Sequence, residues 1–160
     1  MANTPESIAL LWKRLEEKKV MIPSDVWAVW RVGCIRELVD ICNITEKSRG
    51  GPIPASDAEA IGKKAYLVQK FVRSIKRSED GGNRIQAERI YMEENVRDLV
   101  AHYIGNDLYK VSLIADIYGV NPDPLAPEKG ALILKNVEAI VEFIELLRRR
   151  TSAVRSRGIS

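Results

Sequence analysis

The chain of 160 residues is poor in the residue types that most catalytic and metal sites use. It has one histidine, two cysteines and two phenylalanines, and no run approaches the roughly 18 apolar residues of a membrane-spanning helix. Phosphate-binding glycine loops, CxxC, HExxH and GxSxG motifs are all absent. Any serine–histidine or cysteine–histidine site would have to use His102. We therefore expect no cofactor and no bound metal.

The two cysteines, Cys34 and Cys42, are too few for a disulfide framework. They lie eight residues apart in an apolar stretch, and a regular helix would separate them by about 12 Å along its axis. Two buried thiols in a reducing compartment fit this pattern best. The N-terminal segment also lacks the basic and apolar regions of a secretory signal. We expect a protein that is intracellular (cytoplasmic) or part of a virion, with no membrane partner.

The composition is typical of one folded domain, with 46% hydrophobic and 29% charged residues. Apolar residues recur at helical spacing along the chain, and no strand alternation is evident. We predict an all-α domain with a front helix or arm over residues 1–22, a bundle of four to five helices over 24–150, and a basic tail over 151–160. An abundance of Ile, Val, Glu, Arg and Lys gives the composition a thermophilic tendency.

Several helix ends are predicted from capping residues. Thr4 and Pro5 are typical of a helix start, and Pro23 is expected to end that first helix. Ser56 opens a Ser-Asp-Ala-Glu capping box, which predicts the start of a helix there. Pro127 suits the first position of the last helix.

A long central helix is predicted to start near Ile85, because apolar residues from there to Tyr103 recur at helical spacing. Gly105, Asn106 and Asp107 are expected to interrupt it. One of the last two would then cap a further short helix.

Positive charge is concentrated in two segments, 60–78 and 146–160, which hold eleven of the 25 basic residues and none of the 22 acidic ones. In the first segment, four bases fall on the helix face opposite the apolar residues and form a predicted basic ridge. They are Lys63, Lys70, Arg73 and Arg77. Because a merely soluble surface mixes both signs of charge, this ridge predicts contact with the phosphate backbone of a nucleic acid.

The second basic segment begins at the end of the last helix. There Arg148, Arg149 and Arg150 complement the negative end of the helix dipole. Arg155 and Arg157 lie beyond the apolar pattern on a tail of small residues, which is typical of phosphate or partner binding. All five are predicted to neutralise phosphates without reading bases.

The sequence RDLVAH at residues 97–102 resembles the Arg–polar–x–x–x–His signature of HEPN domains, and residues 103–108 resemble the segment after that signature in one branch of the family. HEPN domains are all-helical and include many toxin ribonucleases. The resemblance implies that His102 is a general acid/base, that Arg97 stabilises the phosphorane, and that two copies face each other to cut RNA. The alternative is a structural pair on a helix flank, with Asp98 or Glu94 as ion-pair partners.

The amphipathic front helix and the tryptophan-bearing second helix offer more apolar surface than one small bundle needs, which favours self-assembly. We therefore predict a non-enzymatic, nucleic-acid-binding protein that assembles with itself as a coat or architectural protein. The small helical coat proteins of filamentous archaeal viruses are similar in kind. Two alternatives remain: a HEPN-type ribonuclease or toxin, and a helical subunit of an RNA-guided complex that uses the same ridge.

Overall fold

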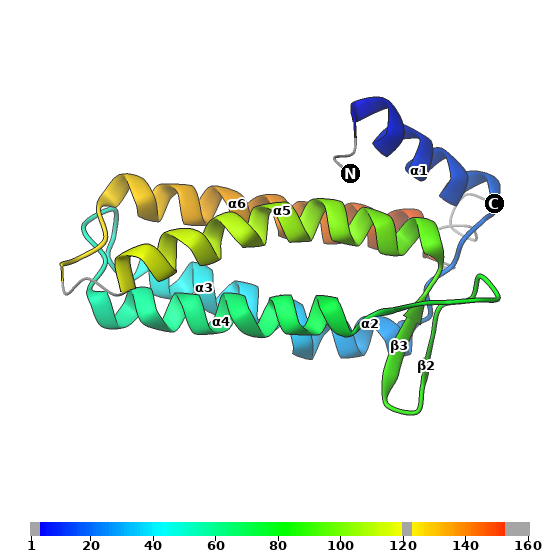
Figure 1. The fold of residues 1–160 in the computed structure, drawn as a ribbon, viewed down its shortest axis with the longest axis horizontal. Coiled ribbons are helices and arrows are strands. Elements are labelled where there is room, and N and C mark those ends of the chain that lie inside the picture. Colours follow the sequence, from blue (N-terminus) through cyan, green and yellow to red (C-terminus); the bar gives the residue numbers. More distant parts are fainter. Residues whose placement is uncertain (1–3, 120–122, 153–160) are drawn as a thin grey trace.

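In the computed structural model, which describes residues 4–119 and 123–152, four long helical segments run side by side and a shorter helix lies across one end (Figure 1). The helices are α1 (Pro5–Glu17), α2 (Ser24–Trp30), η1 (Arg31–Ile35), α3 (Arg36–Glu46), α4 (Ala55–Ser74), α5 (Glu94–Gly119) and α6 (Pro127–Arg150). The strands are β1 (Lys76–Arg77), β2 (Arg84–Gln86) and β3 (Arg89–Met92). The predicted helical bundle with a front helix is confirmed, apart from the small sheet.

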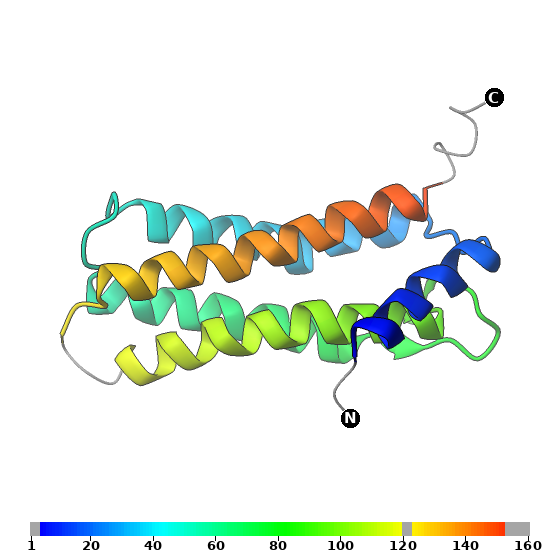
Figure 2. The same cartoon turned by 90° about the horizontal axis from the view of Figure 1, so that it is seen from above.

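The four long segments occupy the corners of a square. Helix α4 packs on α3 and α5, and α6 also packs on α3 and α5, so α4 and α6 lie at opposite corners (Figures 1 and 2). The core between them is aliphatic, with fully buried side chains such as Leu38, Ile61, Leu99, Ile104, Leu108, Ile133 and Ile140. Helix α4 therefore has an outer face that no other helix of the described chain covers, whereas α1 packs on α5.

The front helix α1 begins as predicted and ends earlier than predicted. Thr4 Oγ1 accepts a hydrogen bond of 3.1 Å from the Ser7 amide, which is the N-cap expected from the sequence. The helix ends at Glu17, and Lys19 turns the chain with a φ of 51° well before Pro23. Trp12 packs on α5 and α6, and its ring centroid lies 6.1 Å from that of Phe143. This aromatic contact helps to hold α1 against the bundle.

The second segment is helical without a break from α2 through α3, and η1 is a π-helical widening in its middle. Gly33 lies in this widening, where a Cβ would come within 2.3 Å of the Phe71 ring on α4. Trp30 meets the same ring edge-on at 5.3 Å and is fully buried. Trp30 is therefore a core residue. Because Gly33 has no side chain, α4 can pack close to the second helical segment at this point.

The start of α4 corrects one prediction. The helix begins at Ala55 behind Pro54, whose extended backbone (ψ 148°) makes it the N-cap, so the Ser56 capping box does not form. Asp57 lies in the first turn and forms a salt bridge of 3.3 Å with Lys47. A carboxylate in the first turn favours the helix through its dipole, wherever the cap lies.

The sheet after α4 corrects a second prediction, since a helix was expected from Ile85. Strands β2 and β3 pair antiparallel across a turn at Ala87 and Glu88, and β1 pairs parallel with β3. The two turn residues have φ of 50° and 63°, a conformation that usually requires Gly or Asn. On β3, Ile90 and Met92 are buried at a spacing of two. Without a turn signal, three short strands were indistinguishable from a helix by apolar spacing.

Helix α5 corrects a third prediction, because it runs unbroken through residues 105–107. It starts where the buried Glu93 side chain accepts hydrogen bonds from the Asn95 amide (3.1 Å) and the Val96 amide (3.2 Å). Ile104 and Leu108 continue the buried face past the expected break. Burial of such side chains outweighs the roughly 1 kcal/mol that a glycine costs inside a helix.

We expect Gly33→Ala to lower the free energy of unfolding by about 1–3 kcal/mol, because the added methyl group must displace the Phe71 ring. Gly105→Ala is the matched control, since a Cβ there meets no atom within 4 Å, and alanine favours a helix over glycine by about 1 kcal/mol. Urea unfolding followed by circular dichroism measures both variants. Equal effects of the two substitutions would contradict the packing role of Gly33.

Candidate nucleic-acid interface

The outer face of α4 carries a line of exposed polar side chains, which we call the α4 stripe. It consists of Lys63, Tyr66, Lys70 and Arg73. Their spacing of three, four and three residues places them on one side of the helix, opposite the buried Ile61, Ala65 and Val68. The Tyr66 side chain is 57% exposed. The ring therefore lies among cations on a face that other described elements leave uncovered.

Neighbouring acids reduce the charge that this part of α4 offers. Lys63 forms an i,i+4 salt bridge of 3.3 Å with Glu59, and both side chains are largely exposed. Lys64 lies off the stripe between Asp40 (3.0 Å) and Glu37 (3.1 Å), and these hydrogen-bonded carboxylates raise its pKa. Asp40 and Glu37 come from α3, so the absence of acidic residues from segment 60–78 did not reveal them.

Lys70 and Arg73 differ from these lysines, because neither forms a salt bridge within the described part of the chain. Both are exposed on the last turns of α4. The stripe therefore has two uncompensated cations, one weakly paired lysine and one exposed tyrosine.

The predicted ridge is shorter than expected. Helix α4 ends at Ser74, and Arg77 lies on β1, where its guanidinium is 3.4 Å from the Asp98 carboxylate of α5. Arg77 therefore does not continue the stripe. Tyr66 is a residue of this face that the charge pattern did not predict, although its position three residues after Lys63 and four before Lys70 already indicated the same face.

The arginines at the end of α6 have different environments. Arg148, Arg149 and Arg150 are exposed. Arg150 also bonds Glu16 at 3.0 Å and lies over the Trp12 ring at 5.1 Å, so it fastens α1 to α6. Arg155 and Arg157 lie outside the described residues.

Arg97 and His102 both lie on the unbroken helix α5, and no contact joins them among the described side chains. Five residues on a regular helix turn two side chains about 140° apart. Arg97 lies in the first turn, and its Nε donates a 3.1 Å hydrogen bond to the Ile75 carbonyl oxygen. The ring of His102, which is half-buried, meets Tyr103 edge-on at 5.0 Å.

The acids proposed as partners of this pair are engaged elsewhere. Asp98 meets Arg77, and Glu94 lies 3.5 Å from Lys18. Asp107, five residues further along α5, lies within range of the charge of His102. Burial raises the pKa of Asp107, and the nearby charges of Lys110 and His102 oppose that rise.

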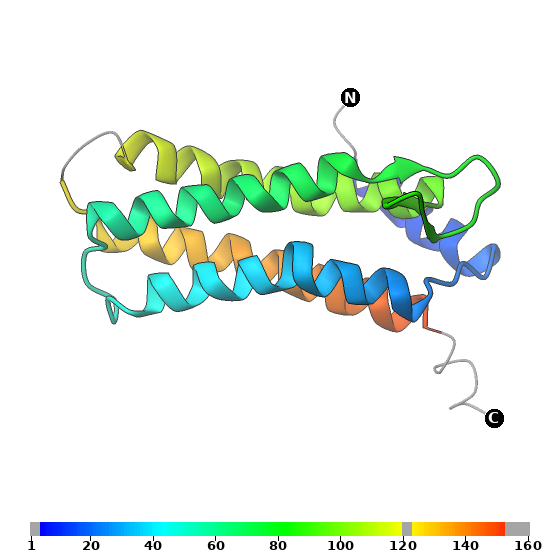
Figure 3. The ribbon, with the colours of Figure 1, turned by 90° about the horizontal axis from the view of Figure 1, so that it is seen from below.

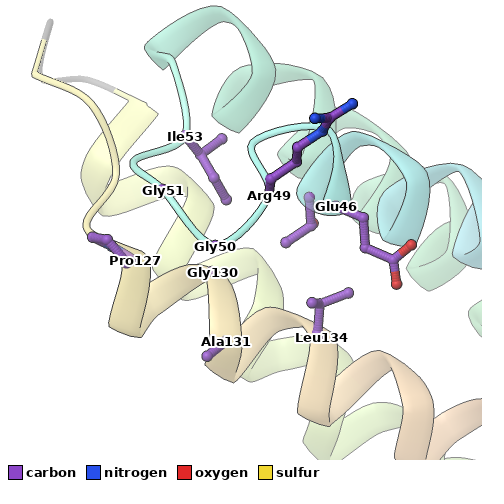
Figure 4. Close-up of a pocket in the computed structure, with 10 residues that line it drawn as sticks. Glu46, Arg49, Gly50, Gly51, Ile53, Pro127, Gly130, Ala131 and Leu134 are labelled. Carbon is purple, nitrogen blue, oxygen red and sulfur yellow. The ribbon is translucent and has the colours of Figure 1, made fainter.

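One further hollow, of about 260 Å³, lies between the end of α3, the following loop and the start of α6 (Figure 4). Its walls are mainly Ile53, Leu134 and backbone near Gly130, and its two charged residues, Glu46 and Arg49, are exposed. Ligand sites usually exceed 300 Å³ and contain converging polar groups. We therefore assign no ligand to this hollow.

In the described ranges, no group of three or more His, Cys, Asp or Glu side chains is arranged to hold a metal ion. Nor does any helix there combine the length and apolar character that crossing a bilayer requires. No protein-family model matches the sequence, and no curated protein or solved structure shows significant similarity to it.

The buried thiol of Cys34 predicts a pH dependence of stability. Burial raises its pKa from 9.0 to about 12, so the unfolded chain loses this proton at a lower pH than the folded chain. The contribution of the protonated Cys34 thiol to the free energy of unfolding is therefore complete below pH 9. It falls by about 1.4 kcal/mol per pH unit as the pH rises towards 12. Between pH 8 and 10, the free energy of unfolding measured in urea should fall by about 1.4 kcal/mol more in the wild type than in Cys34→Ala. The same pH dependence in both proteins would refute this.

Proposed function

We propose that this chain is a non-enzymatic nucleic-acid-binding protein that works as an assembly of copies, in the manner of a coat or architectural protein. The α4 stripe is the observation that carries the proposal. It presents Lys63, Lys70 and Arg73 along one exposed helix face, and the last two have no acidic partner in the described structure. Mobile cations on a rigid helix suit phosphates, which they neutralise without reading base sequence.

The dimensions of the stripe support contact with a phosphate backbone. From Lys63 to Arg73 the helix rises about 15 Å, which is long enough to meet several successive phosphates of one strand. Tyr66 lies between the cations with most of its ring accessible. An exposed aromatic ring beside cations can stack on an unpaired base, as in proteins that bind single strands.

Large exposed apolar side chains support the assembly of copies. In the described chain they include Val32 (61% exposed), Tyr109 (62%) and Leu67 (48%). Side chains of this size on several faces favour contact with further protein surfaces.

Neutralising the stripe should weaken the salt dependence of nucleic-acid binding. Lys63→Gln with Arg73→Gln removes two phosphate contacts, so the slope of log K against log salt should become shallower by up to about 1.4 for single strands or 1.8 for duplexes. Fluorescence anisotropy over a salt series measures the slope. Lys110→Gln with Lys135→Gln is the control, because it removes the same charge from exposed sites on α5 and α6. Equal slopes for both variants would show that net charge, not the stripe, drives binding.

Two alternatives keep their own support. A subunit of an RNA-guided complex would use the same stripe and would differ only in its partners. A HEPN-type ribonuclease would use Arg97 and His102, and the feature that favours it is the half-buried His102, whose charge reaches the Asp107 carboxylate.

The nuclease alternative predicts RNA cleavage without metal that His102→Ala abolishes while leaving the melting temperature unchanged. We expect the wild-type protein and His102→Ala to bind RNA equally and to leave it intact, because His102 lies off the α4 stripe. Gel analysis of labelled RNA in the presence of EDTA measures cleavage. Cutting by the wild type alone would overturn the non-enzymatic proposal.

A further inference from the structure

A groove runs between the second helical segment and α4 and continues to the β-hairpin. It is made of two hollows of about 390 and 460 Å³ that share Phe71 and Ser74. We call it the α2–α4 groove. Its lining residues include Val32, Leu67, Lys70, Phe71, Lys76 and Arg89.

The floor of the groove is apolar and open. Phe71 lies at its centre, seated against Gly33. Val32, Leu67 and Val29 flank it with 61%, 48% and 36% of their surfaces exposed. This much accessible apolar surface beside a hollow is typical of a site that a helix of another protein chain occupies.

The rim of the groove is positive. Its three cations, Lys70, Lys76 and Arg89, form no salt bridge in the described structure. Of the two acids, Glu37 is bound by Lys64 at 3.1 Å, which leaves only Glu88 to oppose the cations. A complementary partner therefore presents negative charge.

The outer face of α6 has that character. Glu138, Glu142 and Glu145 are exposed at a spacing of four and three residues, and on the same side of the helix the exposed Lys135 precedes them and Arg149 follows them. None of the three forms a salt bridge within the described residues. We call these residues, with the small Ala139 beside them, the acidic α6 face.

The fold keeps these two surfaces apart within one molecule. Helix α6 lies at the corner of the bundle diagonally opposite α4 (Figures 2 and 3). A protein with complementary surfaces on opposite sides joins to its own copies head to tail, which gives a ring or an open filament.

We propose that the acidic α6 face of one copy docks into the α2–α4 groove of the next. This inference rests on the proposed function, because it names the contact through which the copies assemble. The single convex helix fills the hollow, and its carboxylates meet Lys70, Lys76 and Arg89 at the rim. Lys63 and Arg73 do not line the groove, so they stay accessible to nucleic acid.

Charge reversal tests this contact without nucleic acid present. One variant carries Glu138→Lys and Glu142→Lys, and the other carries Lys70→Glu and Lys76→Glu. Every altered side chain is exposed and free of salt bridges, so both variants should fold, which circular dichroism checks. Multi-angle light scattering should find large species for the wild type at low salt and at least a tenfold loss of association for each variant alone. An equimolar mixture of the two should restore the large species, because each reversed surface again meets its opposite.

Lys13→Glu with Lys110→Glu is the control for the variant with Lys70→Glu and Lys76→Glu, since it makes the same charge change away from both surfaces and should assemble as the wild type does. The docking proposal is overturned if the wild type stays monomeric, if either reversed variant assembles normally, or if mixing restores nothing. Any of these results leaves the salt-slope test of Lys63 and Arg73 unaffected. If the salt-slope test fails but mixing the two variants restores assembly, nucleic-acid binding by the stripe is refuted and the docking contact stands.

Discussion

The contact between the Phe71 ring and Gly33 sets the spacing on which the rest of the bundle depends. A side chain at position 33 would have to displace the ring, because a Cβ there would lie 2.3 Å from it. The π-helical turn around Gly33 and the edge-on contact with Trp30 hold the ring in place. The same arrangement forms the floor of the α2–α4 groove. Core packing and the proposed docking surface thus share one side chain.

Acidic side chains outside segment 60–78, mostly on neighbouring helices, determine which of its basic residues are paired. Segment 60–78 contains no acid, yet Lys64 is neutralised by carboxylates of α3 and Arg77 by Asp98 of α5. What remains uncompensated is Lys70 and Arg73 on α4. The cations that matter for a phosphate backbone are therefore fewer than the sequence indicates. The exposed Tyr66 among them adds a stacking surface that charge counting does not find.

The proposals for function depend on separate sides of the bundle. Cations stand on α4 and carboxylates on α6, and these helices occupy opposite corners. Such a distribution favours head-to-tail assembly, in which each added copy presents a new groove and a new acidic face. The part of the stripe that lies off the groove then repeats along the assembly. Repetition of weak phosphate contacts increases overall affinity without any new type of contact.

Local signals in the sequence predict most of the helices, because apolar spacing, the Thr4 cap and Pro127 act over one or two turns. It could not show the hairpin, whose turn places Ala87 and Glu88 at positive φ without a glycine signal. Nor could it show that α5 continues past Gly105, where burial against α4 and α6 outweighs local preference. Which charges stay unpaired depends on the folded arrangement of the helices, because several ion pairs form between residues that lie far apart in the chain.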